Sequence, residues 1–503
     1  MRYLLLLFIT FSICTVKAQL VKNEQKIGWK NGVKVELFPD FKDGINDIKL
    51  KSFPNKDKSL NCVVITKRDS IIANVYNSKL EVLYTFKTIN LTFEEPLNFF
   101  PIGGFFKDDC LTIILKSNPS TLENIVCNLK TLEIKRYSST IENKDKRYAT
   151  TINAGDICYQ VYVGKKSPLI SILSNDDHNG YKESTFNLNK DLNTYVSDKE
   201  LLKALTPKAR MENIQKLTFI DKQLITNADD AVSKNKMYLS NDTLTLTIDN
   251  VYLDTKIFTL NLSNNNLSYK SISHEVERDS VGEIITVVDS SVDLMEKSYN
   301  SIIIDNILYH LFVSPILLKL SATNLINEQL LFVNKTFVPQ DINYKNTKII
   351  QEGTSASSTE TKELNTEQLL RKILRGSAVL SGTRNNSSQH QLTIGGYKHL
   401  ESNSGAGGFG GFGGVGGMML GTTFGLSLNR NWDMVTRFKT LFDPITSKHI
   451  PGEITETGSD LIDDYVKDVK MPVQGSDTFY SDGNTYYTYY DNDLKSLITI
   501  QLK

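Results

Sequence analysis

The residues with the clearest chemical pattern form an oxygen-rich run, Asn175-Asp176-Asp177-His178-Asn179-Gly180. Asn175, Asp177 and Asn179 place side-chain oxygens at alternate positions, and a glycine follows, as at the start of a calcium-binding loop. Asparagine replaces the usual first aspartate, however, and Phe186 stands where the closing glutamate belongs. Because Asn-Gly is also a strong hairpin-turn signal, we favour a plain turn. Calcium is a disfavoured possibility, and no other cofactor is predicted.

Motifs for common enzyme chemistry are missing from the sequence. It has no G-x-S-x-G nucleophile elbow, no H-E-x-x-H zinc motif and no Walker A lysine. Gly405, Gly407 and Gly410 match a nucleotide-binding pattern, but their registers overlap and a strand-like run follows instead of a helix. Carboxylates are plentiful, although no pair stands out as an acid and base. We therefore favour a non-enzymatic protein and assign no catalytic residues.

The charge balance excludes another class of function. The 503 residues include 57 Lys or Arg and 57 Asp or Glu, so the formal net charge is zero. Nucleic-acid-binding proteins usually carry an excess of basic residues, and we expect no nucleic-acid partner. The hydrophobic fraction of 40% is sufficient for a packed core.

The N-terminus has the features of a secretory signal peptide. A basic start precedes a short apolar run, and Val16 and Ala18 occupy the −3 and −1 positions of a cleavage site. We therefore expect residues 1–18 to be removed and the protein to be exported to the periplasm, the cell surface or the medium. The apolar segment 302–320 contains Asp305 and Lys319, which are costly inside a bilayer, so we predict buried strands there and no transmembrane span.

Four cysteines remain after removal of the signal peptide. They are Cys62, Cys110, Cys127 and Cys158. An even number in an oxidising compartment would permit two disulfides. Each cysteine nevertheless lies in or beside an apolar, strand-like run, where free cysteine is often buried, and we favour four buried thiols.

A two-strand unit recurs along the chain and indicates the fold class. Each copy has a β-rich run, a short turn rich in Asn, Ser, Asp or Lys, and a second run that alternates apolar and polar residues. Five copies occupy residues 71–86, 124–137, 257–272, 316–332 and 486–500, and a weaker copy occupies 167–188. This spacing suits blades of four strands. We predict a mainly β, propeller-like repeat of antiparallel sheets with small helical insertions; the alternative is a multi-sheet β-sandwich.

The repeat also suggests how the two ends of the chain meet. Residues 33–38 and 497–502 both alternate like half-buried strands. Because an unpaired strand exposes backbone hydrogen-bonding groups, we predict that both runs are strands in the same or adjacent sheets.

The predicted organisation has four parts. After the signal peptide at 1–18, residues 19–352 form the first part of the β body, with a helical insertion near 197–217. Residues 353–390 are expected to form a Ser-rich loop and a helical insertion, and residues 391–503 the remaining β body. A tract with nine glycines at 405–417 is expected to be a long loop. A further helical face is predicted from Leu461, Tyr465 and Val469.

These features favour an exported binding or interaction scaffold in the cell envelope or outside it, with a protein or polysaccharide as partner. A rigid β framework with long loops is a common arrangement for binding. Two alternatives remain: a hydrolase acting on polysaccharide through carboxylates in a central funnel, and a structural envelope component. The C-terminal tyrosines at 480, 486, 487, 489 and 490 could stack on sugars, but we expect them to pack within a sheet.

Cleavage of the signal peptide is directly testable. The mature protein is expected to begin at Gln19, because small residues at 16 and 18 meet the requirement of the processing enzyme. Intact-mass measurement of the exported protein would show this start. Retention of Met1, or a lipid on Cys14, would contradict the prediction.

Overall fold

A computed structural model gives the fold of the chain. It describes residues 19–21, 29–36, 48–67, 70–88, 100–118, 120–142, 145–175, 180–189, 198–205, 217–221, 228–251, 254–274, 297–352, 361–399, 433–454, 456, 458, 460–462, 465, 473–481, 484–491 and 496–502. The predicted signal peptide and glycine-rich tract lie outside these residues.

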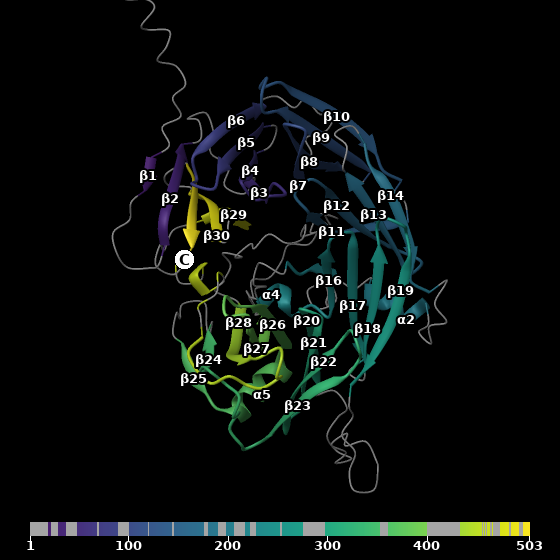
Figure 1. The fold of residues 1–503 in the computed structure, drawn as a ribbon, viewed down its shortest axis with the longest axis vertical. Coiled ribbons are helices and arrows are strands. Elements are labelled where there is room, and N and C mark those ends of the chain that lie inside the picture. Colours follow the sequence, from purple (N-terminus) through teal and green to yellow (C-terminus); the bar gives the residue numbers. More distant parts are fainter. Residues whose placement is uncertain are drawn as a thin grey trace, which may run out of the picture.

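Within the described ranges the strands form seven sheets, which surround a central axis like the blades of a propeller (Figure 1). The predicted propeller-like fold is therefore confirmed. Blades 1 to 3 each have four antiparallel strands. Blade 1 contains β3 (Ile48–Pro54), β4 (Leu60–Lys67), β5 (Ser70–Asn77) and β6 (Val82–Thr88). Blade 2 contains β7 (Phe100–Lys107), β8 (Cys110–Asn118), β9 (Thr121–Asn128) and β10 (Ile134–Thr140). Blade 3 contains β11 (Lys146–Asn153), β12 (Cys158–Gly164), β13 (Leu169–Asn175) and β14 (Lys182–Asn187).

Blades 4 and 5 follow the same plan, and blade 4 has one additional inner strand parallel to its neighbour. Blade 4 contains β15 (Leu217–Phe219), β16 (Asn235–Ser240), β17 (Thr243–Val251), β18 (Asp254–Asn261) and β19 (Leu267–Ser273). Blade 5 contains β20 (Ser298–Ile304), β21 (Ile307–Val313), β22 (Leu317–Asn324) and β23 (Leu330–Phe337). The segment 302–320 thus forms strands, as predicted, and no helix in the described part is long and apolar enough to cross a membrane.

Blades 6 and 7 combine strands out of chain order. Blade 6 contains, from the outside inward, β25 (Lys362–Leu364), β24 (Ile349–Glu352), β28 (Asp433–Phe442), β27 (His390–His399) and β26 (Ser377–Arg384). Blade 7 contains, from the inside outward, β29 (Val473–Ser481), β30 (Asn484–Asp491), β31 (Ser496–Leu502), β2 (Trp29–Glu36) and β1 (Gln19–Val21). Strand β26 lies within 353–390, which the sequence had assigned to a loop and a helix.

The two ends of the chain meet in blade 7. Strand β2 pairs antiparallel with β31, and Val33 lies opposite Thr499. Figure 1 shows these first and last strands side by side. The prediction that the two terminal runs are strands in the same or adjacent sheets is confirmed for the described residues, and their pairing closes the sheet that joins the beginning of the propeller to its end.

A repeated side-chain bond shapes the turn between the third and fourth strands of several blades. In blade 1 the side-chain oxygen of Asn77 accepts hydrogen bonds from the backbone N–H groups of Lys79 and Glu81, and Leu80 adopts a left-handed conformation. Asn128, Asn261 and Asn324 accept the equivalent bonds in blades 2, 4 and 5. Asparagine suits this place because its side chain can cap the turn locally. This turn explains the recurring hairpin in the sequence.

The fifth predicted hairpin is a true hairpin, but it occupies a different place in its blade. It consists of β30 and β31, which are the second and third strands of blade 7, because β2 supplies the fourth strand.

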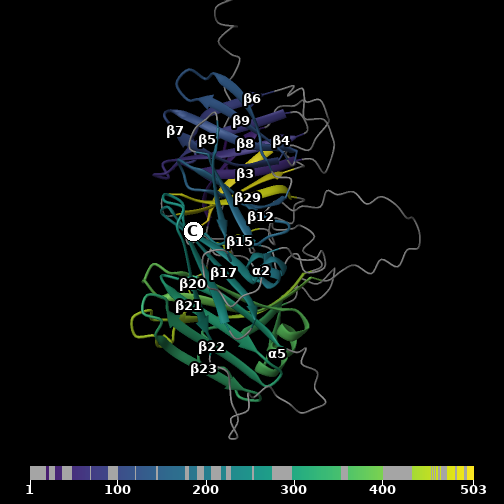
Figure 2. The same ribbon diagram turned by 90° about the vertical axis from the view of Figure 1, so that its right-hand side faces the viewer.

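The ring has two faces, which differ in the connections they carry. Since strands alternate in direction, the turns between the first and second strands and between the third and fourth strands of a blade lie on one face, which we call the turn face. The remaining connections lie on the opposite connector face. Helices α2 (Asp198–Leu205) and α5 (Thr366–Arg375) both lie on one side of the ring (Figure 2).

The helices follow the sequence signals closely. Helix α5 lies in the predicted helical insertion and begins with a capping box, in which the side chains of Asn365 and Gln368 accept hydrogen bonds from each other's backbone N–H groups. Gly376 is the C-cap that ends the helix. Helix α2 packs Leu201 and Leu205 into the core between blades 3 and 4. A short helix, α4 (Ala228–Ala231), precedes β16.

Apolar side chains fill the spaces between neighbouring sheets. Separate buried clusters join blades 7 and 1, blades 1 and 2, blades 2 and 3, and blades 3 and 4. Another cluster joins blade 5 to blade 6 and includes Ile220 and Tyr238 from blade 4. Each sheet is therefore buried on both faces, and burial of apolar area supplies most of the stabilisation of such a fold.

A helical segment whose described residues include Asp460, Leu461, Ile462 and Tyr465 links blade 6 to blade 7. Asp460 forms ion pairs with Arg437 and Lys439 of β28. On its other side, Leu461 and Tyr465 pack against the sheet of blade 7, and the Tyr465 hydroxyl lies 2.7 Å from that of Tyr489. The predicted helical face at Leu461 and Tyr465 is thus real, whereas Val469 lies outside the described residues.

Charge removal from Asp460 tests the importance of this link. We expect Asp460→Asn to lower the free energy of unfolding by about 1–3 kcal/mol, because it removes the carboxylate that pairs with the largely buried Lys439 and leaves Arg437 with its ion pair to Glu352. Glu363→Gln is the matched control: its pair with Lys348 is exposed and should contribute less than about 1 kcal/mol. Urea denaturation of both variants would measure the difference, and equal losses would contradict the proposed link.

Candidate functional site

A polar groove lies between the outer strands of blades 4 and 5. Its volume is about 430 Å³, within the range of pockets that hold small ligands. One wall comes from the end of β19, and the other comes from β22 and β23. The lining residues are Ser271, Ile272, Ser273, His274, Lys319, Ser321, Thr323, Glu328, Leu330 and Val333. The lining therefore offers four hydroxyl groups, one histidine, one cation and one carboxylate, beside three aliphatic side chains.

Strand geometry explains why these hydroxyls face the groove. Lys319, Ser321 and Thr323 occupy alternate positions of β22, and alternate residues of a strand point to the same face. Ser271 and Ser273 are related in the same way on β19.

A chain of hydrogen bonds holds the groove histidine from behind. The Thr255 hydroxyl donates to the buried carboxylate of Asp249 at 2.7 Å and lies 2.9 Å from Nε2 of His274. Because a hydroxyl has only one proton to donate, Nε2 of His274 must carry the proton and donate it to Thr255. This chain fixes both the orientation and the tautomer of His274.

His274 also stacks on a second histidine. Its ring lies 3.5 Å from that of His310, at an interplanar angle of 11°. Burial lowers the pKa of His274 to about 4, although the Asp254 carboxylate opposes the shift. Burial, together with the neighbouring His274 and Lys319, holds the pKa of His310 well below its ordinary value. Both rings are therefore neutral at neutral pH.

These pKa values bear on the chemistry available to the groove. A general base works best when its pKa lies near the working pH. A histidine with a pKa of about 4 is a weak proton acceptor at neutral pH, but it still forms hydrogen bonds. The geometry therefore suits binding of a polar ligand better than proton transfer.

A buried lysine on strand β16 fastens blade 4 to blade 5. Lys236 is 1% exposed, and its ammonium group donates to the backbone oxygens of Ser233 and Ser301 at 2.7 Å and to the Asn300 side chain. Burial lowers its pKa to about 8. Such a pKa could suit catalysis, but this ammonium group is fully engaged and enclosed, so we assign it a structural role.

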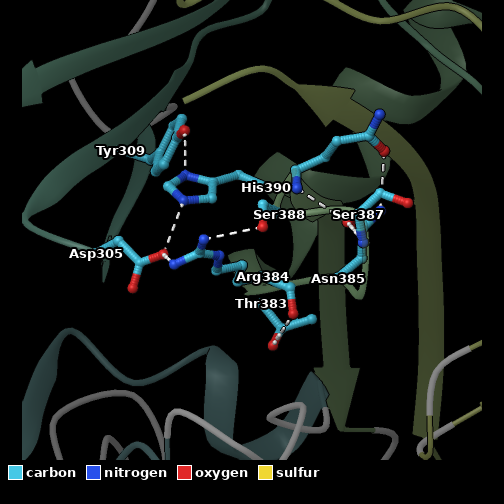
Figure 3. A network of polar contacts seen from close by, with 9 residues as sticks. Asp305, Tyr309, Thr383, Arg384, Asn385, Ser387, Ser388 and His390 are labelled. Carbon is cyan, nitrogen blue, oxygen red and sulfur yellow. Dashed lines mark hydrogen bonds and ion pairs between the residues drawn. The ribbon is translucent and has the colours of Figure 1, made fainter. Parts of the chain in front are cut away.

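A second polar network joins the turn faces of blades 5 and 6 (Figure 3). Asp305 lies in the turn between β20 and β21, and its carboxylate is 3.3 Å from Nε2 of His390. The other ring nitrogen lies 2.7 Å from the Tyr309 hydroxyl. Arg384, from the neighbouring turn of blade 6, is 3.5 Å from Asp305 and 2.9 Å from Ser388.

The Asp305–His390–Tyr309 arrangement resembles a proton relay, but its burial argues for a different role. His390 is 0% exposed, and burial lowers its pKa despite the hydrogen bond with Asp305. Burial also raises the pKa of Tyr309 well above its ordinary value. A neutral histidine that donates to Asp305 and accepts from Tyr309 satisfies every bond in the network, and we interpret it as a tie between the two blades.

The candidate calcium ligands are only partly described. The Asn175 side chain accepts a hydrogen bond from Gln160 at 2.7 Å and donates one to the backbone oxygen of Gly180 at 3.0 Å. Both ends of this side chain are therefore used within the protein. Asp177 and Asn179 lie outside the described residues, and among those that are described no group of three metal-binding side chains occurs.

The other residues singled out in the sequence have packing roles. The tyrosines at 486, 487, 489 and 490 are buried, and Tyr480 lies under the Lys58 ammonium group. The four cysteines are free thiols; Cys62, Cys127 and Cys158 are buried, as expected, whereas Cys110 is only half-buried. Burial raises the pKa of Cys127 and of Cys158 to about 12, which makes both poor nucleophiles.

The groove residues were not selected from the sequence. His274 is far along the chain from Lys319 and from His310, on which its ring stacks, and these residues match no spaced motif. The useful signal was the placement of His310 and Lys319 inside an apolar run, because a polar residue there must find a partner.

Comparison with known proteins gives only distant similarities. No family model and no curated protein matches the chain. Among solved structures, a prolyl endopeptidase has a TM-score of 0.35 at 11% identity, covering 96% of this chain and 50% of its own, so this chain spans about half its length. The WD40 domain of SCAP from fission yeast has a TM-score of 0.31 at 10% identity, covering 96% and 90%. An oligogalacturonate lyase in complex with manganese has a TM-score of 0.35 at 9% identity, covering 97% and 98%.

The neutral histidine pair predicts a specific loss of stability in acid. Because the folded-state pKa of His274 lies below its unfolded value, its stabilising contribution is present above about pH 6.5 and is lost as the pH falls toward 4. This pKa difference corresponds to about 3 kcal/mol. We expect His274→Phe to reduce the fall in melting temperature between pH 7 and pH 4.5.

Thr255→Val is the matched control for this effect. It removes the hydrogen bonds of Thr255 to His274 and to Asp249 but keeps both histidines, so it should lower the melting temperature at both pH values and leave the acid-induced fall due to the histidines unchanged. Thermal unfolding followed by circular dichroism at the two pH values measures both effects. An acid-induced fall in His274→Phe as large as in the native protein would contradict the assignment.

Proposed function

We propose that this protein is an exported, non-enzymatic scaffold that binds polysaccharide in the cell envelope or outside the cell. The observation that carries the proposal is the groove between blades 4 and 5, whose two walls present rows of hydroxyl groups. Sugars display many hydroxyls, and a site with matching donors and acceptors can select among them because an unmatched buried polar group is costly. The signal-like N-terminus supports export.

Several features favour binding over catalysis. His274 is a weak base at neutral pH. His390 and Lys236 are enclosed by the structural partners described above. The buried carboxylate of Asp477, on β29, likewise accepts a hydrogen bond from the backbone of Ser52. The blades also form a rigid frame, so the groove needs little ordering when a ligand enters, which favours affinity.

The proposal can be tested with purified mature protein and a panel of soluble neutral and acidic polysaccharides, using isothermal titration calorimetry. We expect saturable binding of at least one polymer. Ser273→Phe, which narrows the groove and removes a lining hydroxyl, should weaken that binding by about tenfold or more. Ser268→Phe is the control, because Ser268 is exposed on the same strand and does not line the groove.

The same samples distinguish a binding protein from a hydrolase. Prolonged incubation with the bound polymer should release no new reducing ends. Release of reducing ends would identify an enzyme. A lack of binding across the panel, or equal weakening by Ser268→Phe and Ser273→Phe, would refute the polysaccharide groove.

A further inference from the structure

A second cavity, distinct from the groove, lies beside helix α5 on blade 6. Its volume is about 800 Å³. Strands β24 and β25 form one side of the cavity, and α5 forms the other. The lining residues are Gln351, Thr361, Lys362, Glu363, Leu364, Gln368, Arg371, Lys372 and Arg375. Four of these side chains are basic and one is acidic.

The carboxylates near this cavity are already paired. Glu363 forms an ion pair with Lys348 at 2.7 Å, and Glu367 forms one with Arg371 at 2.6 Å. Within each pair, the positive and the negative charge neutralise each other. Lys362, Lys372 and Arg375 are left as cations at the cavity.

The remaining cations have no counter-charge. Across the described ranges, Lys362, Lys372, Arg375 and the nearby Lys398 take part in no ion pair, and the Lys372 ammonium group donates instead to the sulfur of Met434 at 3.8 Å. A thioether is a weak acceptor. Burial lowers the pKa of Lys372, and the charges of Arg375, Lys362 and Lys398 lower it further. These three cations therefore repel the Lys372 ammonium group.

Helix geometry accounts for only part of this cluster. Lys372 and Arg375 lie in the last turn of α5, where cations interact favourably with the helix dipole. Lys362 comes from β25 and Lys398 from β27, so the dipole does not explain their presence. Strand β25 and helix α5 thus bring Lys362, Lys372 and Arg375 to one cavity, and the charge of Lys398 on β27 acts on Lys372.

We propose that this cavity binds a phosphate or sulfate group of an external ligand. Arginine and lysine both recognise such oxyanions, and the arginine fork can donate two parallel hydrogen bonds. A doubly charged group would offset the repulsion that Lys362, Arg375 and Lys398 exert on the Lys372 ammonium group. The proposal concerns a site on blade 6 and does not depend on the groove between blades 4 and 5.

The test uses the full mature protein and defined probes. Melting temperature and calorimetric binding are measured with inorganic pyrophosphate, sodium sulfate, dextran sulfate and neutral dextran, against sodium chloride at equal ionic strength. We expect saturable binding of pyrophosphate or sulfate, or of dextran sulfate, and none of dextran. Binding of the small anions indicates that the group alone is recognised, and binding of dextran sulfate alone indicates a polymer-borne group.

Two variants locate the site. Lys362→Gln and Arg375→Gln should each weaken anion binding by about tenfold or more, whereas Lys182→Gln, an exposed lysine of β14, should leave it within about twofold. Without ligand, Lys362→Gln should keep or raise the melting temperature, because it relieves repulsion. A lower melting temperature in Lys362→Gln would indicate a structural role, and it would overturn the proposal, as would absence of saturable anion binding or equal binding by all variants.

Discussion

The pairing of the N-terminal strand β2 with the C-terminal strand β31 is the constraint on which the rest of the ring depends. Strand β2 lies beside β31 within blade 7, and the inner strand of that blade, β29, packs against β3 of blade 1. An edge strand left without a neighbour exposes its backbone hydrogen-bonding groups. The sheet that combines both termini satisfies those groups and holds blade 1 in place.

Buried polar side chains fasten several junctions of the ring. Between blades 7 and 1, the carboxylate of Asp477 accepts hydrogen bonds from the backbone and hydroxyl of Ser52, and burial raises its pKa. Lys236 fastens blade 4 to blade 5, and His390 fastens blade 5 to blade 6. Since apolar packing alone is non-directional, these bonds help to fix how each blade is positioned against the next.

The two cavities differ in a way that matters for ligands. The groove between blades 4 and 5 combines hydroxyls and a neutral histidine with one cation and one carboxylate, whereas the cavity beside α5 has four basic side chains and one acidic side chain. The groove offers both hydrogen-bond donors and hydrogen-bond acceptors, and the cavity beside α5 offers positive charge and hydrogen-bond donors. A polymer that carries both hydroxyl and anionic groups has chemistry suited to both cavities, while a small anion has chemistry suited only to the second.

The sequence by itself determined the local structure. Asparagines at strand ends and alternating apolar residues specified the hairpins, and Asn365, Gln368 and Gly376 specified both ends of α5, because these signals act within a few residues. The tertiary structure alone decided which strands share a blade. It placed 486–500 at the second and third positions of its sheet, because the fourth strand comes from the other end of the chain. It also brought His274 to His310, and Lys362 to Arg375, through packing of elements that no sequence spacing relates.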